Sequence, residues 1–283
     1  MDQQAYKGME TAWCPGCGNF GILNAVKQAL LELEKKPQEI MLFSGIGQAA
    51  KLPHYMRGHV FNGLHGRALP AAQAAKLANH RLTVLAFGGD GDMYGEGGNH
   101  FLHAIRRNVD ITVLVHDNRI YGLTKGQASP TTDLGVKTKV QTEGVINGPL
   151  NPLALAISQH CAFVARGFSG SIEHLTTMIK AGIAHPGFSY IEVMQPCVSF
   201  NHINTHAWYK ERIYDVAQDG KHDPTNYLSA LEKAEEWGSR IPLGVIYRND
   251  RPAYDSLCGA LKNGPLVDQV FRPELIAQFI RHY

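Results

Sequence analysis

Short runs of β-branched and apolar residues alternate along the chain with segments whose apolar residues recur every three to four positions. The apolar runs predict strands at residues 40–43, 82–87, 111–115 and 188–193. The periodic segments predict helices at residues 19–34 and 69–78, and a third helix that ends at Asn108. Strands that alternate with helices are typical of a parallel sheet with helices on both faces. The pattern therefore predicts an α/β fold with a doubly wound, mostly parallel sheet flanked by helices.

Polar and glycine-rich residues follow two of these strands. Phe87-Gly-Gly-Asp-Gly-Asp92 comes after one strand, and Asp117-Asn118 comes after the next. A strand–helix–strand unit places its two strands parallel, so Asp90 and Asn118 are expected at the same edge of the sheet. Carboxylate and amide oxygens suit a hard cation such as Mg²⁺, and flanking glycines let backbone N–H groups approach an anion. Gly-Asp-Gly is also a common turn, but its spacing to Asn118 favours a metal-bound diphosphate.

Composition narrows the classes of protein that fit. A chain of 283 residues, 44% hydrophobic and 18% charged, is typical of a globular protein of one large or two small domains. The net charge of +2 gives no broad basic surface for nucleic acid or an anionic membrane. Apolar runs are too short for a membrane-spanning helix, and the first residues lack a secretion signal pattern. We therefore expect a cytoplasmic protein with neither a nucleic-acid nor a membrane partner.

Five cysteines, an odd number, argue against a disulfide framework. Cys14 and Cys17 form a Cys-x-x-Cys pair with three interpretations: a redox pair, incidental structural cysteines, or two thiolate ligands of a metal or iron–sulfur cluster. No βαβ unit precedes the pair, which disfavours the redox interpretation. Thiolate ligation is favoured, with Cys197 as the candidate third ligand, whereas Cys161 and Cys258 are expected to be structural.

A second glycine-rich loop, Ser44-Gly-Ile-Gly-Gln-Ala-Ala50, fits a dinucleotide-binding pattern. That pattern requires an acidic residue about twenty positions later, yet residues 40–89 contain neither Asp nor Glu. Pro53 also disfavours the helix that should follow the loop. We therefore expect the loop to form a second wall of a phosphate or cofactor pocket. Cations that suit an anionic substrate or cofactor follow it, among them Lys51, His65 and Arg67.

The pattern is weaker beyond the last cysteine of this group. A helix is expected at residues 227–237, capped by Thr225 or Asn226. An edge strand is expected at residues 241–247, because an edge position tolerates its proline. A short helix with proline in its first turn is expected at residues 272–280.

Four motifs together carry a family resemblance: Cys14-Pro-Gly-Cys17-Gly, Gly63-Leu-His-Gly-Arg-Ala-Leu-Pro70, Gly-Asp-Gly with Asn118, and Tyr121-Gly-Leu-Thr-Lys-Gly-Gln127. In this order they resemble the β subunit of the 2-oxoacid:ferredoxin oxidoreductases. The resemblance implies a thiamine-diphosphate-binding fold and oxidative decarboxylation of a 2-oxoacid to acyl-CoA and CO₂, with electrons passed through a [4Fe-4S] cluster to ferredoxin. It implies catalysis only with an α subunit, in a heterodimer or a dimer of heterodimers that uses a 2-oxoacid and coenzyme A. The Tyr-Gly-Leu-Thr-Lys-Gly form is similar to members that accept 2-oxoglutarate, whereas pyruvate enzymes tend to carry an Asn-Thr-Gly version.

The resemblance also implies roles for individual residues. It assigns Mg²⁺ to Asp90, Asn118 and the main-chain carbonyl of Ile120, and the cluster to Cys14, Cys17 and Cys197. Around the cofactor it places Ile46, Gly47, Gln48, Ala49, His65, Gly91, Asp92, Gly122 and Leu123. Near the substrate it places Lys51, Leu123 and Lys125, and the catalytic candidates also include His65 and Arg67. Residues 1–205 are then expected to form the thiamine-diphosphate and Mg²⁺ domain with the cluster ligands, and residues 206–283 a C-terminal extension packed on the core or on the partner subunit.

One departure from the family pattern concerns the cluster. Many members have a cysteine in a Gly-Ile-Gly-Cys loop, where this chain has Gln48. Three cysteines then match the cluster ligands of the family. The sequence leaves two candidates for the fourth ligand: a nearby histidine and a residue of the partner subunit. Two other functions stay open with it: a non-oxidative thiamine-diphosphate-dependent decarboxylase or lyase subunit without iron, and a non-catalytic partner subunit. The non-catalytic alternative leaves the spacing of the magnesium ligands unexplained.

Overall fold

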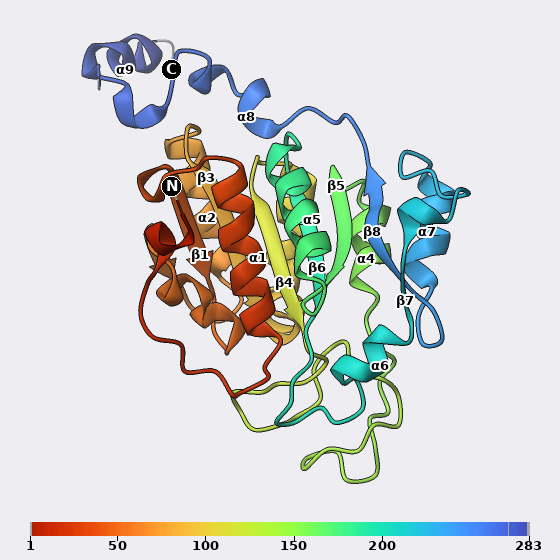
Figure 1. Ribbon diagram of the computed structural model, residues 1–283. Helices are drawn as coiled ribbons and strands as arrows, with labels where there is room; N and C mark the ends of the chain where they lie inside the picture. Colours follow the sequence, from red (N-terminus) through yellow and green to blue (C-terminus); the bar gives the residue numbers. More distant parts are fainter. Residues whose placement is uncertain (1, 271, 282–283) are drawn as a thin grey trace.

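The computed structural model describes residues 2–270 and 272–281. In this part of the chain eight strands form one sheet, in the order β2-β1-β3-β4-β6-β5-β8-β7 (Figure 1). The strands are β1 Ile40–Ser44, β2 His59–Asn62, β3 Thr83–Gly89, β4 Thr112–Asp117, β5 Phe163–Phe168, β6 Ser189–Met194, β7 Ile213–Asp215 and β8 Ile241–Arg248. β5 and β8 pair antiparallel, and the other neighbouring pairs are parallel. The mostly parallel sheet expected from the sequence is confirmed.

Helices cover both faces of the sheet. They are α1 Asn19–Glu32, α2 Ala68–Ala78, α3 Gly98–Arg107, α4 Pro152–Ser158, α5 Ile172–Ala184, α6 His206–Lys210, α7 Tyr227–Glu235, α8 Tyr254–Leu257 and α9 Pro273–Ile280. In Figure 1, α1 and α5 lie in front of the sheet, and α2 and α4 lie behind it. Alternate residues of β3 serve the two faces: Leu85 and Phe87 join the core of α1 and α5, whereas Val84 and Ala86 join the core of α2 and α3. The doubly wound α/β architecture is therefore confirmed.

Most elements predicted in the first two hundred residues are present, with small shifts at their ends. α3 stops before Asn108, whose φ of 57° lies in the left-handed region that asparagine tolerates. The hydrophobic pattern missed β2, β5, β7, α4 and α5. β2 is a short exposed strand, and β5 contains Arg166, which interrupts its apolar run. Both strands therefore lack the continuous run of apolar residues from which β1, β3, β4 and β6 were predicted.

The strand predicted near residue 241 is not an edge strand, because β8 lies between β5 and β7. Its two neighbours pair with different parts of it. β7 pairs with residues 241–243, and β5 pairs with residues 244–248. Pro242 therefore lies where β8 has a partner on one side only, and a residue without a backbone N–H is tolerated there.

The order of the strands reverses between β1 and β3. β2 follows β1 on one side, whereas β4 follows β3 on the other. In open parallel sheets the carboxyl ends of two such strands leave a crevice where ligands bind. The long loop between β4 and α4 and the segment after β6 gather at the same edge, in the lower part of Figure 1. The topology therefore places the two glycine-rich loops of the sequence side by side.

The chain leaves the sheet after β8. α7 is capped by Asn226, whose side chain accepts a hydrogen bond from the Ser229 N–H, so the predicted cap is confirmed. α8 begins at the body, where the Tyr254 N–H donates to the Asn108 carbonyl, whereas α9 extends away from the body (Figure 1). Between them, Asp268 forms an exposed ion pair with Arg81 beyond the end of α2. Within the described residues, no helix combines the length and the apolar character that crossing a bilayer requires.

Candidate active site

A cavity of about 100 Å³ lies at the carboxyl ends of β1 and β3. Loops that follow β1, β3 and β4 form its walls. Every residue that the sequence assigned to the cofactor or to Mg²⁺ lines this cavity: Ile46, Gly47, Gln48, Ala49, His65, Asp90, Gly91, Asp92, Asn118, Ile120, Gly122 and Leu123. These segments are far apart in the sequence and meet because β1, β3 and β4 are neighbours in the sheet.

Asp90 follows β3 and is buried close to a second carboxylate. Thr131 Oγ1 lies 2.7 Å from Asp90 Oδ2 and 2.8 Å from Asp117 Oδ1, so one hydroxyl contacts both groups. Burial, and then the charge of Asp117, raises the pKa of Asp90 to about 7. Two buried carboxylates that share one hydroxyl favour a bound cation, and hard oxygen ligands suit Mg²⁺. The donor set therefore fits a divalent metal ion.

The loop after β4 turns sharply in the wall of the cavity. Arg119 has a φ of 59° in the left-handed region. Asn118 Oδ1 accepts a hydrogen bond from the Ile120 N–H at 3.0 Å, an Asx turn that holds these two residues together. Asn201 Nδ2 donates to the Asn118 carbonyl at 3.0 Å and ties the loop to the segment after β6. The turn therefore holds an amide oxygen and a main-chain carbonyl in one wall of the cavity.

Asp92 joins three loops around the cavity. Its Oδ1 accepts hydrogen bonds from the Ile46 N–H at 3.1 Å and the Gly66 N–H at 2.8 Å. His65 Nδ1 lies 2.9 Å from the same oxygen. A Cβ on Gly45 would lie 2.1 Å from Asp92 Oδ2, so only glycine fits beside this carboxylate. Asp92 therefore positions the loops of the cavity.

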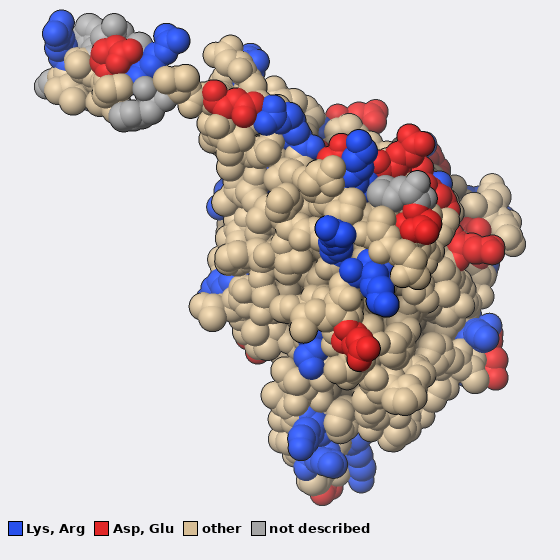
Figure 2. Space-filling view, turned by 60° about the vertical axis from the view of Figure 1, so that its left-hand side comes forward, with Lys and Arg blue, Asp and Glu red and all other residues tan. Residues whose placement is uncertain are grey.

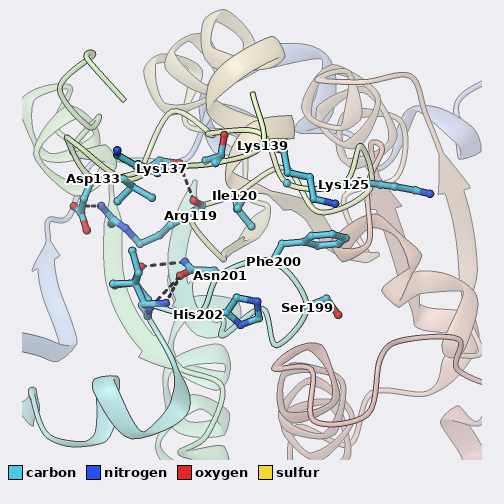
Figure 3. Close-up of a pocket in the computed structure, with 16 residues that line it drawn as sticks. Arg119, Ile120, Lys125, Asp133, Lys137, Lys139, Ser199, Phe200, Asn201 and His202 are labelled. Atoms are coloured by element: carbon cyan, nitrogen blue, oxygen red, sulfur yellow. Dashed lines mark hydrogen bonds and ion pairs between the residues drawn. The ribbon is translucent and has the colours of Figure 1, made fainter. Parts of the chain in front are cut away.

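A second cavity, of about 280 Å³, lies beside the first and is basic (Figure 3). Lys125, Lys137 and Lys139 line it, and Arg119 in its wall is paired with Asp133, with Nη2 and Oδ1 2.5 Å apart. Lys and Arg side chains also gather at the lower end of the molecule in the space-filling view (Figure 2). The charge of this cavity suits an anionic ligand.

The structure separates the expected catalytic residues. His65 and Leu123 line the cofactor cavity, whereas Lys125 lines the basic cavity. Lys51, in the 3-10 helix after β1, and Arg67, which precedes α2, line neither of these two cavities. Because Leu123 and Lys125 are two residues apart, the same short segment runs from the cofactor cavity into the basic cavity.

Cys14, Cys17 and Cys197 line a third cavity, of about 70 Å³. Ser199 Oγ donates to Cys14 Sγ at 3.1 Å, and Gln195 Nε2 donates to Cys17 Sγ at 3.5 Å. Burial raises the pKa of Cys17 to about 11, and the neighbouring thiols add to the shift. Hydrogen bonds to sulfur are typical around iron–sulfur ligands.

The three thiols form a soft donor set in the wall of one cavity. In residues 2–270 and 272–281, no three side chains of His, Cys, Asp and Glu are close enough to hold a single metal ion. Cysteine thiolates are the ligands of iron–sulfur clusters, in which each cysteine binds a different iron, so the chemistry of these residues fits such a cluster. Cys161 is fully buried away from this cavity, as expected for a structural cysteine.

The residues that hold the candidate ligands in place were not predicted from the sequence. They are Thr131, Gln195, Ser199 and Asn201. The last three lie within four residues of Cys197. The predicted ligand Cys197 was therefore the signal in the sequence that could have identified this segment. Thr131 lies in the long loop between β4 and α4, and no local pattern connects it with Asp90.

Several proteins are similar to this chain, among them the two relatives and the one solved structure that follow. The 2-oxoacid:ferredoxin oxidoreductase subunit beta of Saccharolobus solfataricus is 49% identical over 249 residues, 84% of this chain and 82% of that protein. The 2-oxoglutarate oxidoreductase subunit KorB of Mycobacterium tuberculosis is 41% identical over 202 residues, 71% of this chain and 54% of that protein. The 2-oxoglutarate:ferredoxin oxidoreductase from Magnetococcus marinus, with 2-oxoglutarate, coenzyme A and succinyl-CoA bound, has a TM-score of 0.91 and 33% identity over 98% of this chain and 96% of that chain.

Two family models cover most of the chain. The model for the C-terminal TPP binding domain of thiamine pyrophosphate enzymes matches residues 43–193, and the model for the C-terminal part of the pyruvate ferredoxin oxidoreductase beta subunit matches residues 197–263. Fold and site therefore define a thiamine-diphosphate-binding oxidoreductase subunit. The chain belongs to the β subunits of the 2-oxoacid:ferredoxin oxidoreductases, as its sequence motifs predicted. This membership disfavours the non-oxidative and the non-catalytic alternatives.

Proposed function

We propose that this chain, with its α subunit, catalyses the oxidative decarboxylation of 2-oxoglutarate to an acyl-CoA and CO₂. In this proposal electrons pass from the thiamine diphosphate site through a [4Fe-4S] cluster to ferredoxin. One observation carries the proposal: the cofactor cavity and the cysteine cavity share Gln48, Asn118 and Gly122 in their walls. This shared wall supports the proposal, because a cluster bound in the cysteine cavity would lie next to the cofactor as its electron acceptor, which an oxidative reaction requires and a non-oxidative one does not.

The residues of the chain bind and orient the cofactor. When bound, thiamine diphosphate supplies the electron sink for decarboxylation. Asp90, Asn118 and the Ile120 carbonyl are proposed to hold Mg²⁺ against the diphosphate, where the metal neutralises negative charge. The backbone around Gly91 approaches the next loop closely, because a Cβ there would lie 2.2 Å from the Tyr121 ring. This close packing fixes the loop that presents the first metal ligand.

The basic cavity supports a dicarboxylate substrate. Two of the similar proteins are named for 2-oxoglutarate, which has a second carboxylate at the end remote from the oxo group. Lys125 lines the basic cavity, and Ile120 lines both that cavity and the cofactor cavity. A cation at this junction suits the remote carboxylate as a point charge. We assign this role to Lys125 over Lys51, which lines neither cavity.

The proposal is tested on the complex purified anaerobically with its α subunit. We expect thiamine diphosphate, Mg²⁺, iron and acid-labile sulfide in the complex, and a cluster signal in electron paramagnetic resonance (EPR) spectra after addition of 2-oxoglutarate and coenzyme A. Reduction of ferredoxin should require both substrates. A complex that binds thiamine diphosphate and decarboxylates 2-oxoglutarate, but contains no iron, would contradict the oxidative function and favour a non-oxidative one.

A further inference from the structure

Gln48 lies in the wall of the cysteine cavity, at the start of the turn that follows β1. Its backbone is fixed, because Trp13 Nε1 donates a hydrogen bond to the Gln48 carbonyl at 2.9 Å. The Trp13 ring is buried and packs edge-on against Tyr55, with ring centroids 4.7 Å apart. Since Trp13 directly precedes Cys14, this bond ties the loop of Gln48 to the Cys-x-x-Cys segment.

The side-chain oxygen of Gln48 is buried and, in the part of the chain that the structure describes, has no hydrogen-bond partner. Other polar side chains of the cavity wall are engaged. Asn19 Oδ1 lies 2.8 Å from His116 Nδ1, and the Asn118 side-chain oxygen accepts a hydrogen bond within its Asx turn. The Ser199 hydroxyl donates to Cys14 Sγ. A buried acceptor without a donor is unfavourable, so the oxygen of Gln48, a residue that lines both this cavity and the cofactor cavity, is available to a bound electron-pair acceptor.

We infer that the side-chain oxygen of Gln48 is the fourth ligand of the iron–sulfur cluster, beside the thiolates of Cys14, Cys17 and Cys197. The inference rests on the proposed function, which places the cluster in this cavity. Each cysteine loses a proton when it binds iron, whereas the neutral amide loses none. The cluster therefore has one negative charge fewer than a cluster with four thiolates. An iron bound by a neutral oxygen is released more easily, and the lower negative charge raises the reduction potential.

The test uses the anaerobic complex with its α subunit and compares Gln48→Ala and Gln48→Cys with the wild type. Gln73→Ala is the matched control, because Gln73 also has a buried side-chain oxygen without a partner among the described residues but lies in α2, away from the cavity. Iron, sulfide and thiamine diphosphate are measured in every variant, because Gln48 also lines the cofactor cavity. EPR spectra and the rate of iron loss to a chelator are recorded for each.

In Gln48→Ala we expect loss of one iron of four, the EPR signal of a three-iron cluster, and iron loss at least about tenfold faster than in the wild type. Gln48→Cys should retain four irons, lose iron more slowly than the wild type and have a lower reduction potential. Electron–nuclear double resonance (ENDOR) on the wild type, prepared with isotope-labelled glutamine, should show coupling between the cluster and a glutamine side chain. The Gln73→Ala complex should match the wild type in all these properties.

Three results would overturn the inference, and each differs from failure of the proposed function itself. Four irons and unchanged spectra in Gln48→Ala would show that another group binds the fourth iron. Coupling to isotope-labelled water, with none to labelled glutamine, would assign that position to solvent. A wild-type complex without iron would instead contradict the proposed oxidative function, and with it the fourth ligand. If Gln48→Ala does not fold, an unchanged iron-loss rate in Gln48→Cys overturns the inference.

Discussion

The Lys125 side chain is exposed in the basic cavity, two residues from Leu123 in the cofactor cavity. We expect Lys125→Ala to raise the KM for 2-oxoglutarate about 10–100-fold, because a hydrogen bond to a charged group contributes roughly 1.5–3 kcal/mol. The KM for pyruvate, which lacks the second carboxylate, should change little. Steady-state rates of viologen reduction by the αβ complex measure both. Lys137→Ala in the same cavity is the control, and an equal effect there would show a general influence of charge rather than a contact of Lys125.

Gly45 separates the loop after β1 from the carboxylate of Asp92. We expect Gly45→Ala to displace that carboxylate, weaken thiamine diphosphate binding and lower the free energy of unfolding by about 1–3 kcal/mol, as overpacking does. Gly98→Ala is the control, because a Cβ there meets no atom within 4 Å at the start of α3. It should be neutral, or stabilising by up to about 1 kcal/mol. Isothermal titration calorimetry measures the affinity for thiamine diphosphate, and urea unfolding measures the free energy of unfolding. Normal cofactor binding by Gly45→Ala would show that Asp92 does not position the loops of the cofactor cavity.

Residues in contiguous motifs could be predicted from the sequence, whereas their supports could not. Asp90 and Asn118 are each marked by the strand they follow, and parallel pairing alone brings those strand ends together. Asp92 was expected at the cofactor, but its contacts with the Ile46 and Gly66 N–H groups depend on how two other loops fold. Thr131 depends on the path of a loop of more than thirty residues, which has no hydrophobic period to predict it.

At the scale of elements, β5 and β6 are joined by a buried ion pair. Arg166 Nε lies 2.7 Å from Glu192 Oε2, both side chains are buried, and the two residues are aligned in the strand register. We expect Arg166→Met to lower the free energy of unfolding by about 3–5 kcal/mol, because it leaves a buried charge without a partner. Arg166→Met combined with Glu192→Met should recover most of that loss. Urea denaturation measures each variant.

The exposed pair of Lys180 with Glu32, also 2.7 Å apart, is the control for the buried pair. Lys180→Met should change the free energy of unfolding by less than about 1 kcal/mol, since water screens exposed pairs. If Arg166→Met cost no more than Lys180→Met, the burial of the first pair would have no energetic importance.

Elements were predictable where their apolar pattern was continuous. β3 and β4 were predicted because every second side chain faces one of two apolar cores. β5 was missed because its buried charge is compensated by β6, which local sequence cannot show. β8 lies inside the sheet because two different strands pair with different parts of its length. Its proline, the only local signal, wrongly indicated an edge strand.

At the scale of the whole molecule, the C-terminal arm (residues 265–270 and 272–281) projects from the body in Figures 1 and 2. Its helix α9 begins with Pro273, so proline lies in the first turn as predicted. The sequence left open whether the extension of residues 206–283, to which the arm belongs, packs on the core or on the partner subunit. An ion pair of Arg81 with Asp268 connects the arm to the body. Both side chains of this pair are exposed, and such pairs contribute little to stability. The arm exposes several large apolar residues: Leu266, Val267, Val270, Ile276 and Ile280.

We therefore expect that deleting the arm leaves the thermal stability of the isolated chain nearly unchanged but weakens its assembly with the α subunit. Exposed apolar side chains that do not support the core are available to stabilise an interface, where burial contributes about 25 cal/mol per Å². Differential scanning calorimetry of a chain truncated after Gly264, and light scattering of its mixture with the α subunit, test the two parts. Arg81→Ala, which removes only the ion pair, is the control and should assemble normally. A melting temperature lowered by more than about 2 °C, or roughly 1 kcal/mol, would show instead that the arm packs on the core.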